Sequence, residues 1–298
     1  MLERRTTDRL RIALPNKGRL TDDVRALFSD AGLELRAAGE RALVASLGGD
    51  FEAIFVRAQD IPEFVADGAA DAGVTGWDLV RESERALESL LDLECGRCRL
   101  VVAAREESGI LSLDDIVGDD DGGPRVATAF PRITERYFAD ANRPVTIVPV
   151  SGAAEIAPHL GIADIVTDLV STGSTLRVNQ LREIATILES TARLIIAPNG
   201  GNGKRQRAIE ELVTALESVL RARGKRYVMA NMPRASLEQV RRVLPGLNGP
   251  TVIDILNGGD MVAVHAVVAQ EAIYRTIADL KALGGQGILV TRIERVMP

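Results

Sequence analysis

The segment Asp164-Ile-Val-Thr-Asp-Leu-Val-Ser-Thr-Gly-Ser-Thr-Leu176 indicates the fold class, because it combines a strand, a tight turn and the start of a helix. Backbone N–H groups at a helix N-terminus attract anions, and a glycine lets the backbone approach them closely. The stretch therefore predicts a phosphate-binding turn in an α/β fold, consisting of Ser171, Thr172, Gly173, Ser174 and Thr175. The alternative is a plain Ser/Thr helix cap after a strand. The G-x-x-x-x-G-K pattern of a Walker loop is absent.

Two aspartates come before this turn. Asp168 is the first candidate for binding ribose hydroxyls, because a carboxylate accepts hydrogen bonds from both of them. It is also a candidate ligand for a Mg2+ ion that travels with the phosphates of a substrate. Asp164 has the same two alternatives, and a third is that it only caps or orients the turn.

The composition indicates a globular protein of two or three domains. The chain has 298 residues, and 46% of them are hydrophobic, which is enough for real cores. A formal net charge of -6 without a basic tail argues against nucleic acid as the main partner. No apolar run approaches the length of a membrane span and no secretory signal opens the chain, so we expect a cytoplasmic protein.

Strands alternate with helices over the first 223 residues. Strands are expected at residues 10–14, 43–45, 53–56, 71–74, 99–104, 125–129, 145–150 and 194–197. Helices are expected to begin near Thr21, Asp60, Thr75, Phe130 and Ser151, and a long amphipathic helix to end at about residue 223. This alternation implies a mostly parallel sheet in each of two lobes. Gly68-Ala-Ala-Asp-Ala-Gly-Val-Thr75 resembles Gly161-Ile-Ala-Asp-Ile-Val-Thr167, which favours matching lobes over the alternative of coincidence.

After Gly224 the pattern changes to β-α-β-β-α-β, the ferredoxin-like plan. Its strands are expected at residues 227–231, 251–256, 262–268 and 287–293, and its helices at 236–244 and 271–283. A separate small domain at the end of the chain indicates a regulatory or assembly module, and the fold alone does not decide between them.

Three cations and one acid are the remaining candidates for chemistry. Lys17 and Arg19 lie in a glycine-containing loop after the first strand, and Arg57 follows another strand. They would attract charged substrates to a cleft. The alternatives are a solvated basic turn, and for Arg57 a salt bridge to Asp60. Glu155 is expected in the first turn of a helix, where it would accept a proton or a ribose hydroxyl, or only complement the helix dipole.

The two cysteines form Cys95-Gly-Arg-Cys98, which has the spacing of a redox pair or of half a zinc site. A structural zinc site needs four ligands, and Cys98 leads into a strand rather than a helix. We therefore expect this pair to be incidental.

Several segments in a fixed order resemble the long form of ATP phosphoribosyltransferase, the first enzyme of histidine biosynthesis. They are Pro15-Asn-Lys-Gly-Arg-Leu20, Val56-Arg-Ala-Gln-Asp-Ile-Pro62, Asp67-Gly with Asp71-Ala-Gly, Ala127-Thr-Ala-Phe-Pro131, Ser151-Gly-Ala-Ala-Glu-Ile-Ala-Pro158, Gly161-Ile-Ala-Asp164, Asp168-Leu-Val-Ser-Thr-Gly-Ser-Thr-Leu176 and Leu280-Lys-Ala-Leu-Gly284. The resemblance covers the chain after its N-terminal arm, and it implies transfer of a phosphoribosyl group from phosphoribosyl pyrophosphate to N1 of ATP.

The resemblance also implies the architecture and the partners. We expect two lobes resembling periplasmic binding proteins, with residues 1–104 and 191–223 in lobe I and residues 105–190 in lobe II. Residues 225–298 would form the C-terminal domain that binds histidine as feedback inhibitor. The family assembles as a hexamer, for which a dimer–hexamer equilibrium is an alternative, and it requires Mg2+.

The same resemblance assigns roles to residues. Lys17, Arg19 and Glu155 would be catalytic, and Lys17, Arg19 and Arg57 would bind ATP. Asp168 and the turn from Ser171 to Thr175 would bind phosphoribosyl pyrophosphate. The expected histidine contacts are Thr251, Asp254, Asn257 and Asp260. Two rival functions are a two-lobed small-molecule sensor with an effector domain and a catalytically inactive paralogue.

Overall fold

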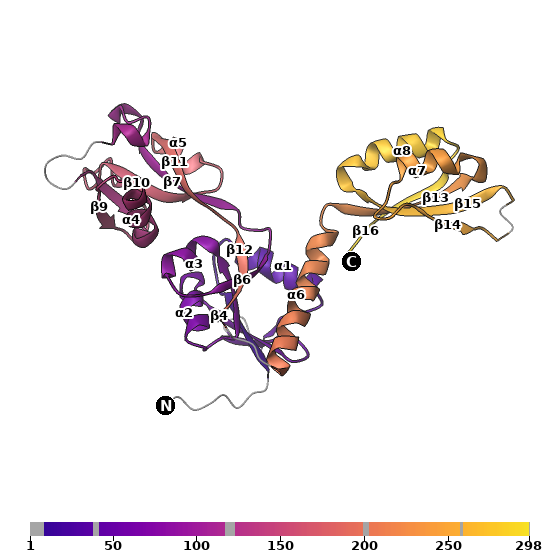
Figure 1. Cartoon of the computed structure of the whole chain (residues 1–298), viewed down its shortest axis with the longest axis horizontal. Helices are drawn as coiled ribbons and strands as arrows, with labels where there is room; N and C mark the ends of the chain where they lie inside the picture. The colour runs from indigo at the N-terminus through magenta and orange to yellow at the C-terminus, as the bar shows by residue number, and fades with distance from the viewer. Residues whose placement is uncertain (1–8, 38–41, 117–122, 199–202, 257–258, 298) are drawn as a thin grey trace. The chain divides into compact units, whose positions relative to one another are not determined.

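The computed structural model describes residues 9–37, 42–116, 123–198, 203–256 and 259–297 (Figure 1). The chain divides into two compact units, Met1–Val213 and Thr214–Pro298. The dividing point lies inside helix α6 (Lys204–Ala222), so this helix contributes to both units. The expected boundary, at about residue 224, falls at the end of the same helix.

The first sheet of the larger unit defines lobe I, with seven strands among the described residues in the order β2-β3-β4-β1-β5-β12-β6. The bounds are β1 Leu10–Pro15, β2 Arg36–Ala37, β3 Val44–Ser46, β4 Phe51–Val56, β5 Ala72–Gly76, β6 Glu88–Asp92 and β12 Ala192–Ile196. β4, β1 and β5 are parallel, and the flanking strands are antiparallel. Its helices are α1 Thr21–Asp30, η1 Ala58–Asp60, α2 Ile61–Ala66 and α3 Trp77–Ser83. Ile61 and Val65 of α2 and Val80 of α3 pack on Ala13 and Ile195, which face the same side of the sheet.

The second sheet defines lobe II and has the order β11-β7-β10-β8-β9 among the described residues. The bounds are β7 Cys98–Arg105, β8 Arg125–Thr128, β9 Thr146–Pro149, β10 Ile165–Val170 and β11 Leu181–Ser190. β9, β8 and β10 are parallel, and β7 and β11 are antiparallel to their neighbours. The helices are η2 Glu106–Ser108, η3 Leu113–Asp115, α4 Pro131–Asp140, η4 Ala154–Ile156 and α5 Ser174–Val178. The predicted α/β lobes are thus confirmed, with a parallel centre in each sheet.

The chain passes between the lobes twice, through residues 93–98 and through residues 190–192, and these two segments pair with each other. Between β6 and β7, the Cys95 carbonyl accepts from the Ala192 N–H at 2.9 Å, and the Leu93 N–H donates to the Ala192 carbonyl at 2.9 Å. Cys98 pairs with Ser190 in the next part of this ribbon. The expected lobe boundary at residue 104 is therefore wrong for β7, which pairs with β10 and β11 of the second sheet. Hydrophobic pattern identifies a strand but does not say which sheet it joins.

The helix expected after Ser151 is also different in the structure. Only the single 3-10 turn η4 forms there, and Ser151 does not cap it. Ala153 adopts a left-handed conformation with φ of 51°, which interrupts the chain before η4. Glu155 therefore lies in a short turn rather than at the start of a long helix.

The two similar segments do occupy matching places in the two lobes. The Asp71 N–H donates to the Arg11 carbonyl at 2.8 Å, and the Arg11 N–H donates to the Asp71 carboxylate at 2.8 Å. The Asp164 N–H donates to the Arg125 carbonyl at 2.9 Å, and the Arg125 N–H donates to the Asp164 carboxylate at 2.8 Å. Each aspartate thus fixes the start of two parallel strands, and the sequence likeness reflects a shared structural device.

The C-terminal unit contains the antiparallel sheet β14-β15-β13-β16 among its described residues. The bounds are β13 Lys225–Pro233, η5 Arg234–Ser236, α7 Leu237–Val243, β14 Thr251–Asp254, β15 Met261–Ala269, η6 Gln270–Ala272, α8 Ile273–Ala282 and β16 Gln286–Arg292. Helices α7 and α8 cover one face of this sheet (Figure 1), where Val240 and Leu280 pack on Val228 and Val264. This arrangement confirms the predicted ferredoxin-like domain.

Candidate active site

The candidate site loops of lobe II lie at one edge of its sheet. Because β8, β9 and β10 are parallel, the segments that follow them leave the sheet at the same edge. These segments begin at Ala129, Val150 and Ser171. In open α/β sheets, ligands bind outside the carboxyl ends of the strands, so this edge is the candidate site.

The loop after β10 has the geometry of a small anion cradle. Gly173 has φ of +73° and precedes α5, whose first internal hydrogen bond runs from the Arg177 N–H to the Gly173 carbonyl at 3.2 Å. The first N–H groups of a helix have no acceptor within it, so those of α5 face outward. The hydroxyls of Thr172 and Ser174 are 3.0 Å apart and exposed. Residues from Asp168 to Leu176 line a hollow of about 50 Å³ here.

Asp168 and Glu155 approach each other beside this loop. Burial raises the pKa of the Asp168 carboxyl, and the nearby negative charge of Glu155 raises it further. The N–H of Leu169 donates to Asp168 at 2.8 Å and acts in the opposite direction. The structure therefore brings together two acids that the sequence placed on separate elements. Asp164, in contrast, lies at the far end of β10, where it binds the Arg125 N–H, so its role is structural.

The basic candidates lie at the carboxyl edge of the lobe I sheet. β1 and β4 are in register up to the pair Pro15–Val56, so the loops carrying Lys17 and Arg57 are neighbours. The side chains of both are exposed, and Arg57 forms no ion pair with Asp60 among the described residues. The Arg19 guanidinium donates to the Cys98 thiol at 3.1 Å, which ties the basic loop to the crossing between the lobes.

A cavity of about 740 Å³ has walls from both lobes. Lobe I contributes Gln59, Asp60, Glu63, Leu79, Glu82 and Ser83, and lobe II contributes Thr128, Ala129, Phe130, Pro131, Pro149, Val150 and Ser151. None of these residues was among the site residues predicted from the sequence. The segment Thr128–Pro131 could have been found, because it follows a strand and opens a helix in the same way as the loop after β10.

The expected histidine contacts lie around β14. The Asp254 carboxylate binds the Arg234 guanidinium, and the backbone N–H of Arg234 donates to the Asp260 carbonyl at 2.8 Å. Thr251 pairs across the sheet with His265, and the His265 Nδ1 is 2.5 Å from the Tyr227 hydroxyl. Asn257 lies outside the described residues.

The donor set near the loop suits an ion brought by a substrate. The described residues hold no group of three side chains able to bind a metal ion. Mg2+ in proteins is often held by one or two carboxylates, with substrate phosphates and water supplying the other ligands. Asp168 fits that pattern. In the described part of the chain, no helix has both the length and the apolar character needed to span a membrane.

The chain is similar to known proteins over nearly its whole length. A sequence profile of ATP phosphoribosyltransferase matches residues 57–218, and one of the HisG C-terminal domain matches residues 222–295. The ATP phosphoribosyltransferase of Gemmatimonas aurantiaca is 69% identical over 293 residues, which cover 97% of this chain and 100% of the relative. That of Methanocaldococcus jannaschii is 46% identical over 288 residues, with coverage of 96% and 99%.

Among solved structures, the ATP phosphoribosyl transferase (HisG:HisZ) complex from Thermotoga maritima matches with a TM-score of 0.59 and 28% identity. The match covers 70% of this chain and 98% of that one. The expected resemblance is confirmed over nearly the full length, and the C-terminal domain is the mark of the long form. The chain therefore belongs to the ATP phosphoribosyltransferase family of histidine biosynthesis.

Proposed function

We propose that this enzyme transfers the phosphoribosyl group of phosphoribosyl pyrophosphate to N1 of ATP, which gives phosphoribosyl-ATP and pyrophosphate. The observation that carries the proposal is the loop after β10, where Gly173 has φ of +73° and the surrounding hydroxyls are exposed beside a half-buried acid. A turn of this kind suits a phosphate. Ser171, Thr172, Ser174 and Thr175 would donate to the phosphate of the substrate, and Asp168 would accept from its ribose hydroxyls.

The two acids beside the loop fit the chemistry of the transfer. As the bond from ribose carbon 1 to pyrophosphate breaks, positive charge develops on the sugar. Asp168 and Glu155 lie close enough for Glu155 to affect the pKa of Asp168, so their combined field would stabilise that charge. Glu155 would also accept a hydrogen bond from the adenine amino group while N1 attacks. Positioning and electrostatics thus do most of the work.

The cations of lobe I complete the proposed site. Lys17 and Arg57 are exposed on neighbouring loops, where they would bind the phosphates of ATP and the departing pyrophosphate. Arg19 would assist from the same loop. Mg2+, held by substrate phosphates and Asp168, would supply further neutralisation of the pyrophosphate.

We further propose that histidine inhibits through the C-terminal unit and that the enzyme works in the cytoplasm as a homo-hexamer. The side of the β13–β16 sheet away from its helices supports assembly through this unit. Met229 of β13, Ile253 of β14 and Leu289 of β16 lie on this side and are 37%, 51% and 60% exposed. Apolar side chains gathered on one sheet face are typical of a contact surface.

The direct test is incubation with ATP, phosphoribosyl pyrophosphate and Mg2+, following the absorbance of N1-substituted adenine. We expect product only when both substrates are present, with pyrophosphate formed in equal amount. Absence of product, with phosphoribosyl pyrophosphate still bound, would favour the inactive paralogue. If the protein neither forms product nor binds phosphoribosyl pyrophosphate, the result would favour the small-molecule sensor.

A further inference from the structure

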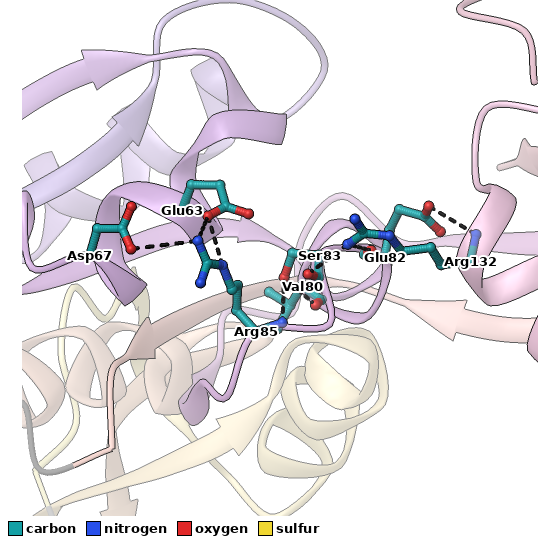
Figure 2. A network of polar contacts seen from close by, with 7 residues as sticks. All are labelled: Glu63, Asp67, Val80, Glu82, Ser83, Arg85 and Arg132. Atoms are coloured by element: carbon teal, nitrogen blue, oxygen red, sulfur yellow. Dashed lines mark hydrogen bonds and ion pairs between the residues drawn. The ribbon is translucent and has the colours of Figure 1, made fainter.

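The ends of helices α3 and α4 meet between the two lobes, and each end is capped by a side chain of the other helix (Figure 2). One Glu82 oxygen accepts from the Arg132 N–H at 3.1 Å, and the other accepts from the Ile133 N–H at 3.1 Å. In return, the Arg132 guanidinium donates to the carbonyls of Glu82 and Ser83 at 3.4 and 3.0 Å. α3 belongs to lobe I and α4 to lobe II, so these four bonds cross the cleft.

The bonds at the start of α4 satisfy the donors that the helix leaves open. The first N–H groups of a helix have no internal acceptor. In α4, Pro131 has no N–H, and the Thr134 N–H donates to the Phe130 carbonyl at 3.1 Å. The remaining donors are those of Arg132 and Ile133, and Glu82 takes both. A carboxylate at this end and a guanidinium at the C-terminal end of α3 also complement the two helix dipoles.

Lobe I holds Glu82 firmly in place. α3 ends at Ser83 and is followed by Glu84 with φ of 54°, and the Ser83 hydroxyl donates back to the Val80 carbonyl at 2.8 Å. Arg85 ties the following turn to α2 through Glu63, at 2.7 Å from its Nε, and through Asp67 at 3.5 Å (Figure 2). The contact between the lobes thus rests on a supported helix end rather than on a loose surface side chain.

We propose that Glu82 and Arg132 form a latch between the lobes that positions the phosphate loop of lobe II against the cations of lobe I. The inference rests on the proposed phosphoribosyl transfer for its effect on rate. Glu82 lines the cavity between the lobes together with Pro131, the residue before Arg132, so the lobe I half of the latch forms part of the cavity wall. Closing a cleft to the right width places the reacting atoms, and a small misplacement slows the reaction strongly. Both are positioning residues and need not touch substrate.

Amide hydrogen exchange on the full-length protein tests the latch without reference to activity. Glu82→Ala should speed exchange of the Arg132 and Ile133 amides by about tenfold or more, because each loses a bond to a charged acceptor. Glu82→Gln offers a single amide oxygen, so it should restore protection to only one of them. Glu135→Gln makes the same charge change on α4 at an exposed position and should leave both amides protected. Equal exchange in wild type and Glu82→Ala would overturn the latch.

Steady-state kinetics test the positioning role. We expect Glu82→Ala and Arg132→Ala to lower kcat by about tenfold, while KM for phosphoribosyl pyrophosphate, set by the loop in lobe II, changes less than about twofold. Arg132→Lys should recover part of kcat. If amide exchange becomes faster but kcat does not change, the contact has only a structural role, and the proposed positioning role is overturned. A wild-type protein without any transfer activity would refute the proposed function and leave the exchange result standing. If Glu82→Ala fails to fold, Glu82→Gln provides both measurements.

Discussion

Replacement of Gly173 by valine is the sharpest test of the phosphate loop. An added Cβ would meet only Val170, at 3.8 Å from its Cγ1, so there is ordinary contact and no clash. The cost comes instead from the backbone, because φ of +73° is a left-handed conformation that β-branched residues avoid. We therefore expect the fold to survive and the loop to relax away from its cradle shape.

The magnitude follows from that strain. Forcing an L-residue with a Cβ into the left-handed region costs about 1–2 kcal/mol. If the loop keeps its shape, this cost lowers stability, which for a unit of this size corresponds to a fall in Tm of about 2–8 °C. If the loop relaxes, the same free energy must be restored on binding, so the Kd for phosphoribosyl pyrophosphate rises at least about 5–30-fold.

Gly161→Val is the matched control. Gly161 has φ of +67° with nothing within 4 Å of an added Cβ, and it precedes β10 at the end away from the loop. It should carry the same strain and lose similar stability, yet bind phosphoribosyl pyrophosphate as the wild type does. Calorimetric titration and thermal unfolding of both variants give the comparison. The phosphate assignment is refuted if Gly173→Val binds normally, or if Gly161→Val loses affinity equally.

Four further predictions concern the site and the C-terminal unit. Lys17→Ala and Arg57→Ala should each lower kcat/KM by about tenfold or more at low ionic strength, and the difference from wild type should shrink as salt screens the cleft; wild-type kinetics in both would make the loops solvated turns. Because the pKa of Asp168 is raised above 3.8, its carboxyl stabilises the fold at low pH and loses that contribution as pH rises through the raised pKa. Asp168→Asn should therefore raise Tm at pH 7 while abolishing substrate binding, and Glu155→Gln should shift the acid limb of the kcat/KM profile to lower pH; an unmoved limb contradicts the coupling. Truncation after Arg223 should remove histidine inhibition, measured as product formation with and without histidine, and inhibition that persists would place the effector site in the lobes.

Local signals made the site loop and the domain plan predictable from the sequence. The strand, turn and helix around Gly173 and the β-α-β-β-α-β pattern after residue 224 are set by neighbouring residues, and the structure contains both. β11 was missed because shifts of register near Ile184 and Ile187 break the alternation expected of a strand. Glu82 and Arg132 gave no signal either, since neighbours in space that lie 50 positions apart share no local pattern. Such pairings depend on tertiary structure.

The pairing of β12 has a consequence for how the chain folds during synthesis. β12 lies between β5 and β6, so the first sheet cannot close until Ala192–Ile196 has been made. The whole second sheet, from Cys98 to Ser190, is complete before then. Domains usually fold in order from the N-terminus at roughly 5–20 residues per second. During the several seconds before β12 is synthesised, the backbone N–H and C=O groups at the edge of β5 remain unpaired. Such an edge can pair with incorrect strands. The lobe that begins the chain is therefore completed only after the lobe inserted within it.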